Sequence, residues 1–244
     1  MTPEETLARL LYRDGLMLVI DKPAGIPVHP GPGGGPNLEQ YFDALRFGLP
    51  NPPSLAHRLD RDTSGCLILG RHPKALRKLG KLFMAGRVDK IYWAIVIGRP
   101  PGSEGRVDLS LRKETPNRGW KMVVDQENGQ TAVTDWKLMG ESDGLSWLEL
   151  YPQTGRTHQI RVHCAALGCP VLGDHVYGPD IDQGKRPPLH LLSRGVTIPI
   201  YNSRPPVTVL APPPAHMRIA LLACGWKEEI INSMASQTCE DEAY

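Results

Sequence analysis

The chain has 244 residues, of which 41% are hydrophobic and 22% charged, and its formal net charge is only +2. This composition is typical of a globular protein with one large or two small domains. The chain has no apolar run near the roughly 18 residues of a membrane span, and its acidic start lacks the features of a secretory signal. Five cysteines, an odd number, favour free thiols in a reducing cytoplasm. Collagen, coiled-coil, membrane and disulfide-rich proteins are excluded, which leaves a cytosolic enzyme or a nucleic-acid binder.

The first hundred residues predict short strands separated by turns and two helices. Strands are expected at 16–20, 65–70 and 88–97, and helices at 38–47, with Asn37 as N-cap, and at 74–85. The second helix is amphipathic and ends before Gly86, a typical C′ residue. Residues 71–90 carry seven Lys or Arg side chains against the single carboxylate of Asp89. This segment is either a polyanion-binding surface or an ordinary solvated helix face.

The rest of the chain predicts more strands than helices. Strands are expected at 106–111, 121–124, 131–138, 145–150, 196–200 and 207–210. Helices are expected at 157–167, with Thr157 as N-cap, and at 215–223. Many strands with few, scattered helices predict an α+β fold with a mixed, mostly antiparallel sheet. We expect one domain over 1–225 and an acidic, disordered tail over 226–244.

A polar cluster, HRLDRDTSG, occupies residues 57–65 immediately before a buried-type strand. Its simplest interpretation is a turn, but charged loops that lead into buried strands are also common places for active sites. Asp62-Thr63-Ser64-Gly65 resembles the Asp-Thr-Gly of aspartic proteases. That chemistry needs two carboxylates from paired motifs, and the chain has no second copy.

A second polar segment, residues 151–178, is rich in His, Cys and Arg. Zinc binding is the obvious alternative, but the spacing of His158, His163, Cys164 and Cys169 fits no common ligand pattern. The arginines of this segment, Arg156 and Arg161, could instead bind an anion or an RNA backbone.

Four stretches together resemble one known family. HRLDRDTSGCLIL resembles the signature loop of the RluA family of RNA pseudouridine synthases. VIDKPAGIPVHP, DKIYWAIVIG and the block over 150–178, with PQTGRTHQIRVH and GDHVYG, resemble three further family motifs in the same order. The resemblance implies an α+β pseudouridine synthase fold with flanking helices and a central RNA cleft. It also implies isomerisation of uridine in RNA, which needs no redox cofactor, nucleotide or metal.

The resemblance assigns catalytic roles to three residues. Asp60 matches the catalytic aspartate, which attacks the sugar or the base and must be ionised. Arg161 matches the basic partner that holds this carboxylate. Tyr92 matches the tyrosine that stacks on the flipped uracil and takes part in removing the C5 proton. The alternation over 88–97 also predicts that Tyr92 lies on the polar side of a strand whose other side is core.

Four further residues are expected to bind substrate. Arg58 matches the side chain that fills the gap left by the flipped base, and Ile160 matches the aliphatic floor of the pocket. Arg156 is expected to contact backbone phosphate. His57 is expected either to contact phosphate or to be a hydrogen-bonded structural histidine.

The expected partner is RNA, a ribosomal or transfer RNA stem-loop, with no DNA and no membrane. The first motif begins near Val19, so we expect a short, monomeric, cytoplasmic member without the N-terminal RNA-binding domain of some relatives. The helix at 74–85 is then a candidate for contacting the RNA backbone. The alternative is a non-catalytic RNA-binding or assembly protein with the same fold, and the intact set of Asp60, Tyr92 and Arg161 argues against it.

Overall fold

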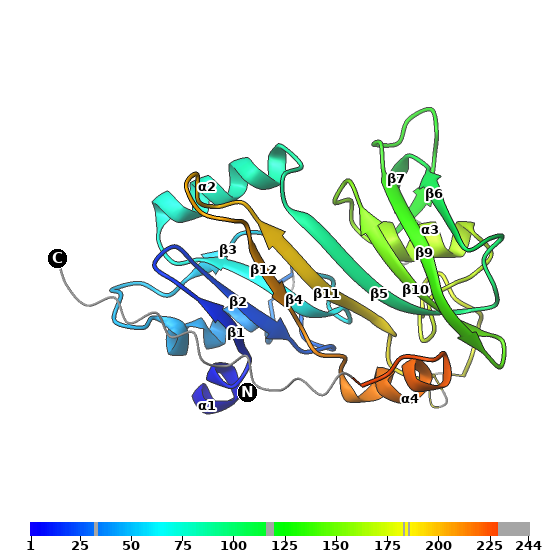
Figure 1. The fold of residues 1–244 in the computed structure, drawn as a ribbon, viewed down its shortest axis with the longest axis horizontal. Helices are drawn as coiled ribbons and strands as arrows, with labels where there is room; N and C mark the ends of the chain where they lie inside the picture. The colour runs from blue at the N-terminus through cyan, green and yellow to red at the C-terminus, as the bar shows by residue number, and fades with distance from the viewer. Residues whose placement is uncertain (32–33, 116–119, 183, 185, 229–244) are drawn as a thin grey trace.

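The computed structural model describes residues 1–31, 34–115, 120–182, 184 and 186–228. Its centre is a ten-stranded mixed sheet (Figure 1). The strands of its main path are, in spatial order, β1 (Leu10–Arg13), β2 (Met17–Lys22), β4 (Ser64–Gly70), β11 (Leu191–Ile198), β5 (Asp89–Ile97), β10 (Leu145–Pro152), β9 (Val133–Ser142) and β6 (Glu104–Asp108). Strand β3 (Ser54–Leu55) pairs with β4, and β12 (Val207–Leu210) pairs with β11. Strands β4 and β11 pair in parallel, and the other named pairs are antiparallel.

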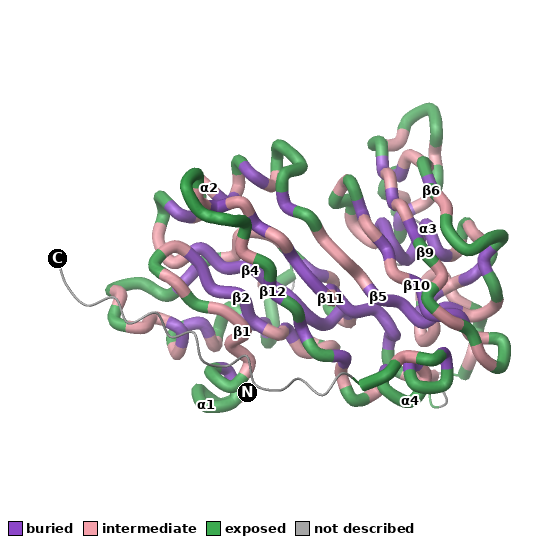
Figure 2. Tube along the Cα trace, viewed as in Figure 1, coloured by how far each residue is buried: buried purple, intermediate pink, exposed green. Residues whose placement is uncertain are grey.

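Both faces of the sheet are covered: its middle strands are largely buried (Figure 2), and their apolar side chains join clusters on both sides. In β4, Cys66 and Ile68 join one cluster, whereas Leu67 and Leu69 join another. The first cluster packs under α2 (Pro73–Met84) and α4 (Ala215–Ala223), and this side is the α2/α4 face. The 3-10 helix η1 (Leu38–Leu45) and helix α3 (Gln159–Ala166) cover opposite ends of the other side, the η1/α3 face.

The junction between η1 and α3 lies over the central strand β5. The half-buried Tyr92 packs against the apolar clusters beneath both helices. The sequence predicted that Tyr92 lies on a polar side of β5. That prediction is wrong, because neighbouring Ala94 and Val96 on the same side are fully buried. Tyr92 is accessible because it lies where the two clusters meet. The expected RNA cleft stays a prediction.

A small antiparallel hairpin projects between β6 and β9. It consists of β7 (Leu111–Glu114) and β8 (Lys121–Val124), which form a separate two-stranded sheet. The expected single strand at 106–111 is therefore divided, because the chain leaves the main sheet after Asp108 to form this hairpin.

The predicted α+β architecture is confirmed, and the strands at 121–124 and 207–210 and the helix at 215–223 have their predicted bounds. Helix α3 begins two residues later than expected because His158 has a left-handed backbone, with φ +53°. Residues 38–45 form a 3-10 helix, and Asn37 makes no side-chain cap. The sequence missed helix α1 (Pro3–Leu7), which carries a Thr2–Glu5 capping box, and strand β1.

The folded domain extends past the expected boundary at residue 225. Trp226 packs edge-on against Trp93 of the core, with ring centroids 6.3 Å apart. Arg218 of α4 forms an ion pair with Glu228 at 3.0 Å. The expected disordered tail beyond 228 lies outside the described residues. Within them, no helix is long and apolar enough to cross a membrane.

The parallel contact between β4 and β11 depends on a glycine. Gly65 has φ +102°, and a Cβ added there would lie 2.3 Å from the backbone oxygen of Ser193. Gly65→Ala should therefore lower the free energy of unfolding by about 2–4 kcal/mol, measured by urea titration. Gly80→Ala is the matched control: Gly80 lies in α2 with nothing within 4 Å, so it should stabilise the protein by about 0.4–1 kcal/mol. Equal effects of the two changes would contradict the assigned strand contact.

Candidate active site

Asp60 lies in the loop between β3 and β4, on the η1/α3 face. The preceding Leu59 is buried in the cluster under η1, and Thr63 is buried where β4 begins. The Thr63 backbone N–H donates to the Asp60 carbonyl at 3.2 Å, which closes a tight turn. The loop is thus anchored on both sides, and the Asp60 side chain keeps 27% of its surface exposed.

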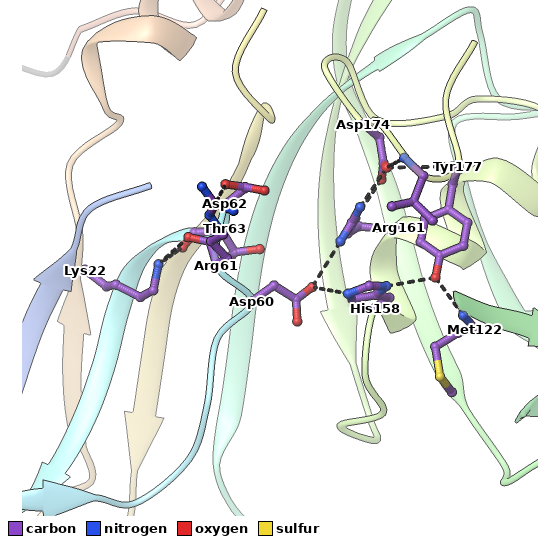
Figure 3. A network of polar contacts seen from close by, with 11 residues as sticks. Lys22, Asp60, Arg61, Asp62, Thr63, Met122, His158, Arg161, Asp174 and Tyr177 are labelled. Carbon is purple, nitrogen blue, oxygen red and sulfur yellow. Dashed lines mark hydrogen bonds and ion pairs between the residues drawn. The ribbon is translucent and has the colours of Figure 1, made fainter. Parts of the chain in front are cut away.

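Lys22 anchors this loop from beneath. The side chain is fully buried, and its Nζ donates to the carbonyl oxygens of Pro23, Arg61 and Thr63 at 2.8–2.9 Å (Figure 3). Burial lowers the pKa of Lys22 to about 7, although the nearby carboxylates of Asp62 and Asp60 favour the charged form. A cation at the end of β2 therefore holds the turn that carries Asp60.

Helix α3 supplies a second cation on the other side of Asp60. The Arg161 side chain is only 3% exposed and forms a two-point contact with the buried Asp174, each N–O distance being 2.7 Å. Asp174 also accepts the backbone N–H groups of Val176 and Tyr177. Burial opposes both charges. Even so, the paired hydrogen bonds and charges raise the pKa of Arg161 and hold that of Asp174 below its usual range.

Arg161 has one nitrogen left for Asp60. Its Nη1 lies 3.7 Å from Asp60 Oδ2, and His158 Nε2 lies 3.9 Å from the same oxygen. Figure 3 shows the Asp60 carboxylate between the Lys22-anchored loop and the side chains of Arg161 and His158. Arg161, which the sequence resemblance pairs with Asp60, thus lies beside it, and His158 lies beside the same oxygen.

Tyr92 and Ile160 line the same region from the sheet and from α3. Ile160 is buried in the apolar cluster against which Tyr92 packs. Burial raises the pKa of the Tyr92 hydroxyl, and the charge of nearby Asp60 adds to this. The phenol is therefore neutral near pH 7, with an aromatic ring beside the carboxylate.

The other expected substrate-binding residues are more dispersed. Arg58 is exposed, with Nη1 3.3 Å from His29 Nε2. His57 accepts the Ile68 N–H at 3.0 Å and stacks on Phe83 of α2, and burial lowers its pKa to about 4. These contacts give His57 a structural role, one of the two that the sequence left open. Arg156 is exposed and donates to the Thr131 carbonyl.

In the described part of the chain, no group of three or more His, Cys, Asp or Glu side chains is arranged to hold a metal ion. His163 instead contacts the Thr134 hydroxyl and the Leu109 carbonyl, and Cys164 and Cys169 lie in the core under α3.

Comparison with known proteins agrees with this geometry. The family model described as RNA pseudouridylate synthase matches residues 16–166, which include the Asp60 loop, Tyr92 and Arg161. The chain belongs to the RNA pseudouridylate synthase family. The resemblance drawn from four sequence motifs is thereby confirmed, and the protein is an isomerase that acts on uridine in RNA.

Relatives of this synthase support the assignment over nearly the whole chain. An RNA pseudouridine synthase of Zymomonas mobilis is 44% identical over 84% of this chain and 94% of its own length. Ribosomal large subunit pseudouridine synthase D of Borreliella burgdorferi is 35% identical over 73% of this chain and 57% of its own. The solved structure of human RNA pseudouridylate synthase domain containing 4 has a TM-score of 0.77 at 27% identity, covering 91% of this chain and 95% of that one.

Sequence reasoning about this pseudouridine synthase missed several residues of the site. Asp174 and Tyr177 lay in the recognised GDHVYG motif, and Lys22 lay in VIDKPAG, but none was given a role. The available signal for Lys22 was a charged Asp-Lys pair at the end of an apolar run, a place where a lysine is seldom buried. His158 had been considered only as a zinc ligand.

Because Lys22 is buried, we expect it to make the free energy of unfolding depend on pH. The substitution Lys22→Met should remove this contribution. Because the pKa of Lys22 is lowered in the folded state, the unfolded chain binds more protons between about pH 7 and 10. Below pH 7 the folded protein bears the full free-energy cost of burying the Lys22 charge. This cost decreases as pH rises above 7, because the buried amine loses its proton. The free energy of unfolding of wild type minus that of Lys22→Met should thus increase by at most about 1.4 kcal/mol per pH unit.

Urea titrations at several pH values between 7 and 10 measure this difference. Lys74→Met, on the exposed side of α2, controls for the loss of a lysine as such. A difference between wild type and Lys22→Met that stays constant across this range would show that burial does not lower the pKa of Lys22.

Proposed function

We propose that this pseudouridine synthase converts uridine in a ribosomal or transfer RNA stem-loop to pseudouridine, with Asp60 as the nucleophile. The observation that carries the proposal is a partly exposed carboxylate held on one oxygen by a buried arginine. Arg161 contacts Asp60 Oδ2. In the described part of the chain, Oδ1 accepts no hydrogen bond. A carboxylate fixed on one oxygen and open on the other can attack an electrophilic carbon.

The reaction exchanges one glycosidic bond for another. The N1–C1′ bond breaks, the uracil turns over, and a C5–C1′ bond forms. The C5 proton is lost and N1 gains one, so the product is an isomer and no oxidant or reductant is needed. Asp60 can assist by attack at C1′ of the sugar or at the base ring, and the proposal covers both.

The target base must leave its stack before Asp60 can reach it, because its reacting atoms are shielded in a stem-loop. Tyr92 offers a neutral ring for the extruded uracil, and base–aromatic stacking contributes about 1–3 kcal/mol. Its position beside Asp60 also suits contact with the C5 proton. The exposed Arg58 guanidinium is available to fill the gap in the RNA.

Replacement of Asp60 by Asn tests the chemistry. Asp60→Asn should lower isomerisation at least about 100-fold, because the amide is a poor nucleophile, and RNA affinity should change little. Isomerisation is measured by tritium release from RNA transcripts labelled with [5-³H]uridine, since only C5 loses its hydrogen.

Asp62→Asn is the matched control, because it makes the same change two residues away, where the carboxylate lies beside Arg61. It should retain most of the activity. Comparable tritium release from Asp60→Asn and wild type would overturn the nucleophile assignment and revive a non-catalytic role in RNA binding or assembly.

The RNA target is proposed from weaker support. One relative is named for the ribosomal large subunit, and the sequence resemblance leads us to expect a ribosomal or transfer RNA stem-loop. We place the activity in the cytoplasm, because the described cysteines are free thiols. Pseudouridine mapping of total RNA from cells with and without the gene would identify the uridine, and an unchanged map of both RNA classes would contradict the proposed target. The monomeric state and the absence of DNA and membrane partners stay predictions.

Three exposed arginines near the site, Arg58, Arg61 and Arg156, are better placed for the RNA backbone than the basic helix α2. The hydrophobic side of α2 packs on the α2/α4 face, opposite to Tyr92 and α3. The sequence-based expectation that α2 contacts RNA is therefore replaced by its alternative, a solvated helix face.

The salt dependence of RNA binding distinguishes these two surfaces. Changing the three arginines together to Ala should flatten the slope of log K against log salt by up to about 2–3, at roughly 0.7–0.9 per lost phosphate contact. Changing the exposed Lys74, Arg77 and Lys81 of α2 to Ala removes the same charge and should leave the slope nearly unchanged. The opposite pattern would return the RNA-binding role to α2.

A further inference from the structure

His158 occupies an unusual backbone position beside Asp60. It is one of three non-glycine residues with positive φ in the described part of the chain, at +53°, and it immediately precedes α3. A side chain is held in this sparsely populated conformation only where its surroundings require it, and such positions cluster at functional sites. The conformation brings His158 Nε2 to the same Asp60 oxygen that Arg161 contacts.

The hydrogen bonds around His158 determine which nitrogen carries the proton. The Met122 backbone N–H donates to the Tyr177 hydroxyl at 2.9 Å, and that hydroxyl lies 2.8 Å from His158 Nδ1. In the described residues the Tyr177 proton has no other acceptor within hydrogen-bond distance, so it is donated to Nδ1. The hydrogen of the neutral ring is then on Nε2 and faces Asp60.

The ring is kept neutral and oriented by its neighbours. Burial lowers the pKa of His158; Asp60 and Asp174 oppose the shift, whereas Arg161 and His175 add to it. The indole of Trp120 stacks on the imidazole with centroids 4.9 Å apart, and the Tyr177 ring meets it edge-on. Trp120 and Met122 belong to the β8 side of the projecting hairpin, so the hairpin helps to fix the imidazole that faces the carboxylate.

We propose that His158 is a positioning residue for Asp60, whose Nε2–H, together with Arg161, fixes Oδ2 and leaves Oδ1 free for the reacting uridine. This inference rests on the proposed role of Asp60 as nucleophile. His158 Nε2 lies 3.9 Å from Asp60 Oδ2. Catalytic contacts of this length in a substrate-free enzyme often tighten when substrate binds. Tyr177 acts one step further away by selecting the tautomer.

Two substitutions separate this role from a purely structural one. In His158→Gln, the side-chain amide nitrogen can lie close to the position of Nε2 in the histidine. In His158→Asn, the residue tolerates the left-handed backbone, but its side chain is too short to reach Asp60. The Asn variant should lower kcat about 10- to 100-fold with RNA Kd within about twofold of wild type, and Gln should recover most of that loss.

Tyr177→Phe should lower kcat in the wild-type background and have no further effect in His158→Asn, because both act through the same contact. Both tests use tritium release from [5-³H]uridine-labelled unmodified ribosomal and transfer RNA transcripts. Equal kcat for the Asn and Gln variants, or a change in Kd alone, would overturn the proposal. Wild type that releases no more tritium than Asp60→Asn would instead indicate failure of the proposed function.

NMR spectroscopy shows which ring nitrogen of His158 carries the proton, independently of any measurement of enzyme activity. Long-range ¹H–¹⁵N spectra of the ¹⁵N-labelled protein at pH 7.5, with His158 assigned by its loss in His158→Gln, should show a neutral ring protonated at Nε2. Tyr177→Phe should mix the tautomers, and Asp60→Asn should shift the Nε2–H signal. A ring protonated at Nδ1, or at both nitrogens, would overturn the proposal.

Discussion

The buried ion pair between Arg161 and Asp174 is the contact on which the site depends. Placing two charges in the protein interior is costly unless their hydrogen-bonding capacity is satisfied. Here two guanidinium–carboxylate bonds and two backbone N–H donors meet that condition. The pair leaves Arg161 rigid, with one nitrogen directed at Asp60. A surface arginine would have to be ordered each time substrate binds, whereas this one is already in place.

A second cation, Lys22, acts from the opposite side and on the backbone. It ties together three carbonyl groups around the Asp60 turn. The carboxylate is therefore oriented by a loop fixed from β2 and by a side chain fixed from α3. Between these anchors lies β5, which is buried over residues 93–96 and carries the half-buried Tyr92 where the clusters under η1 and α3 meet. Tyr92, at the junction of the two clusters, therefore lies near the carboxylate that these anchors hold.

Hydrophobic periodicity was sufficient to predict the α+β class, the amphipathic helix α2 and several strands, because these follow from local apolar spacing. It could not reveal that β5 is buried on both faces, since burial of Ala94 and Val96 is decided by distant helices. Motif resemblance indicated Asp60, Tyr92 and Arg161. The roles of Lys22, Asp174 and His158 depend on contacts across long sequence separations and on the αL backbone of residue 158. No pattern of residue types specifies those contacts.

The parallel pairing of β4 with β11 also bears on when the enzyme becomes competent during its synthesis. Residues 64 and 65 pair with 192 and 193, so the strand that follows the Asp60 loop pairs early with β2 but acquires its other neighbour, β11, only after most of the chain has been made. Contacts of such long separation close slowly. A nascent chain that has emerged only as far as Arg161 contains both Asp60 and Arg161. It still lacks Asp174 and the central strand β11. Assembly of the Asp60 site is in this way postponed until nearly the whole sheet can form, so an incomplete chain on the ribosome would lack the ordered contacts of that site.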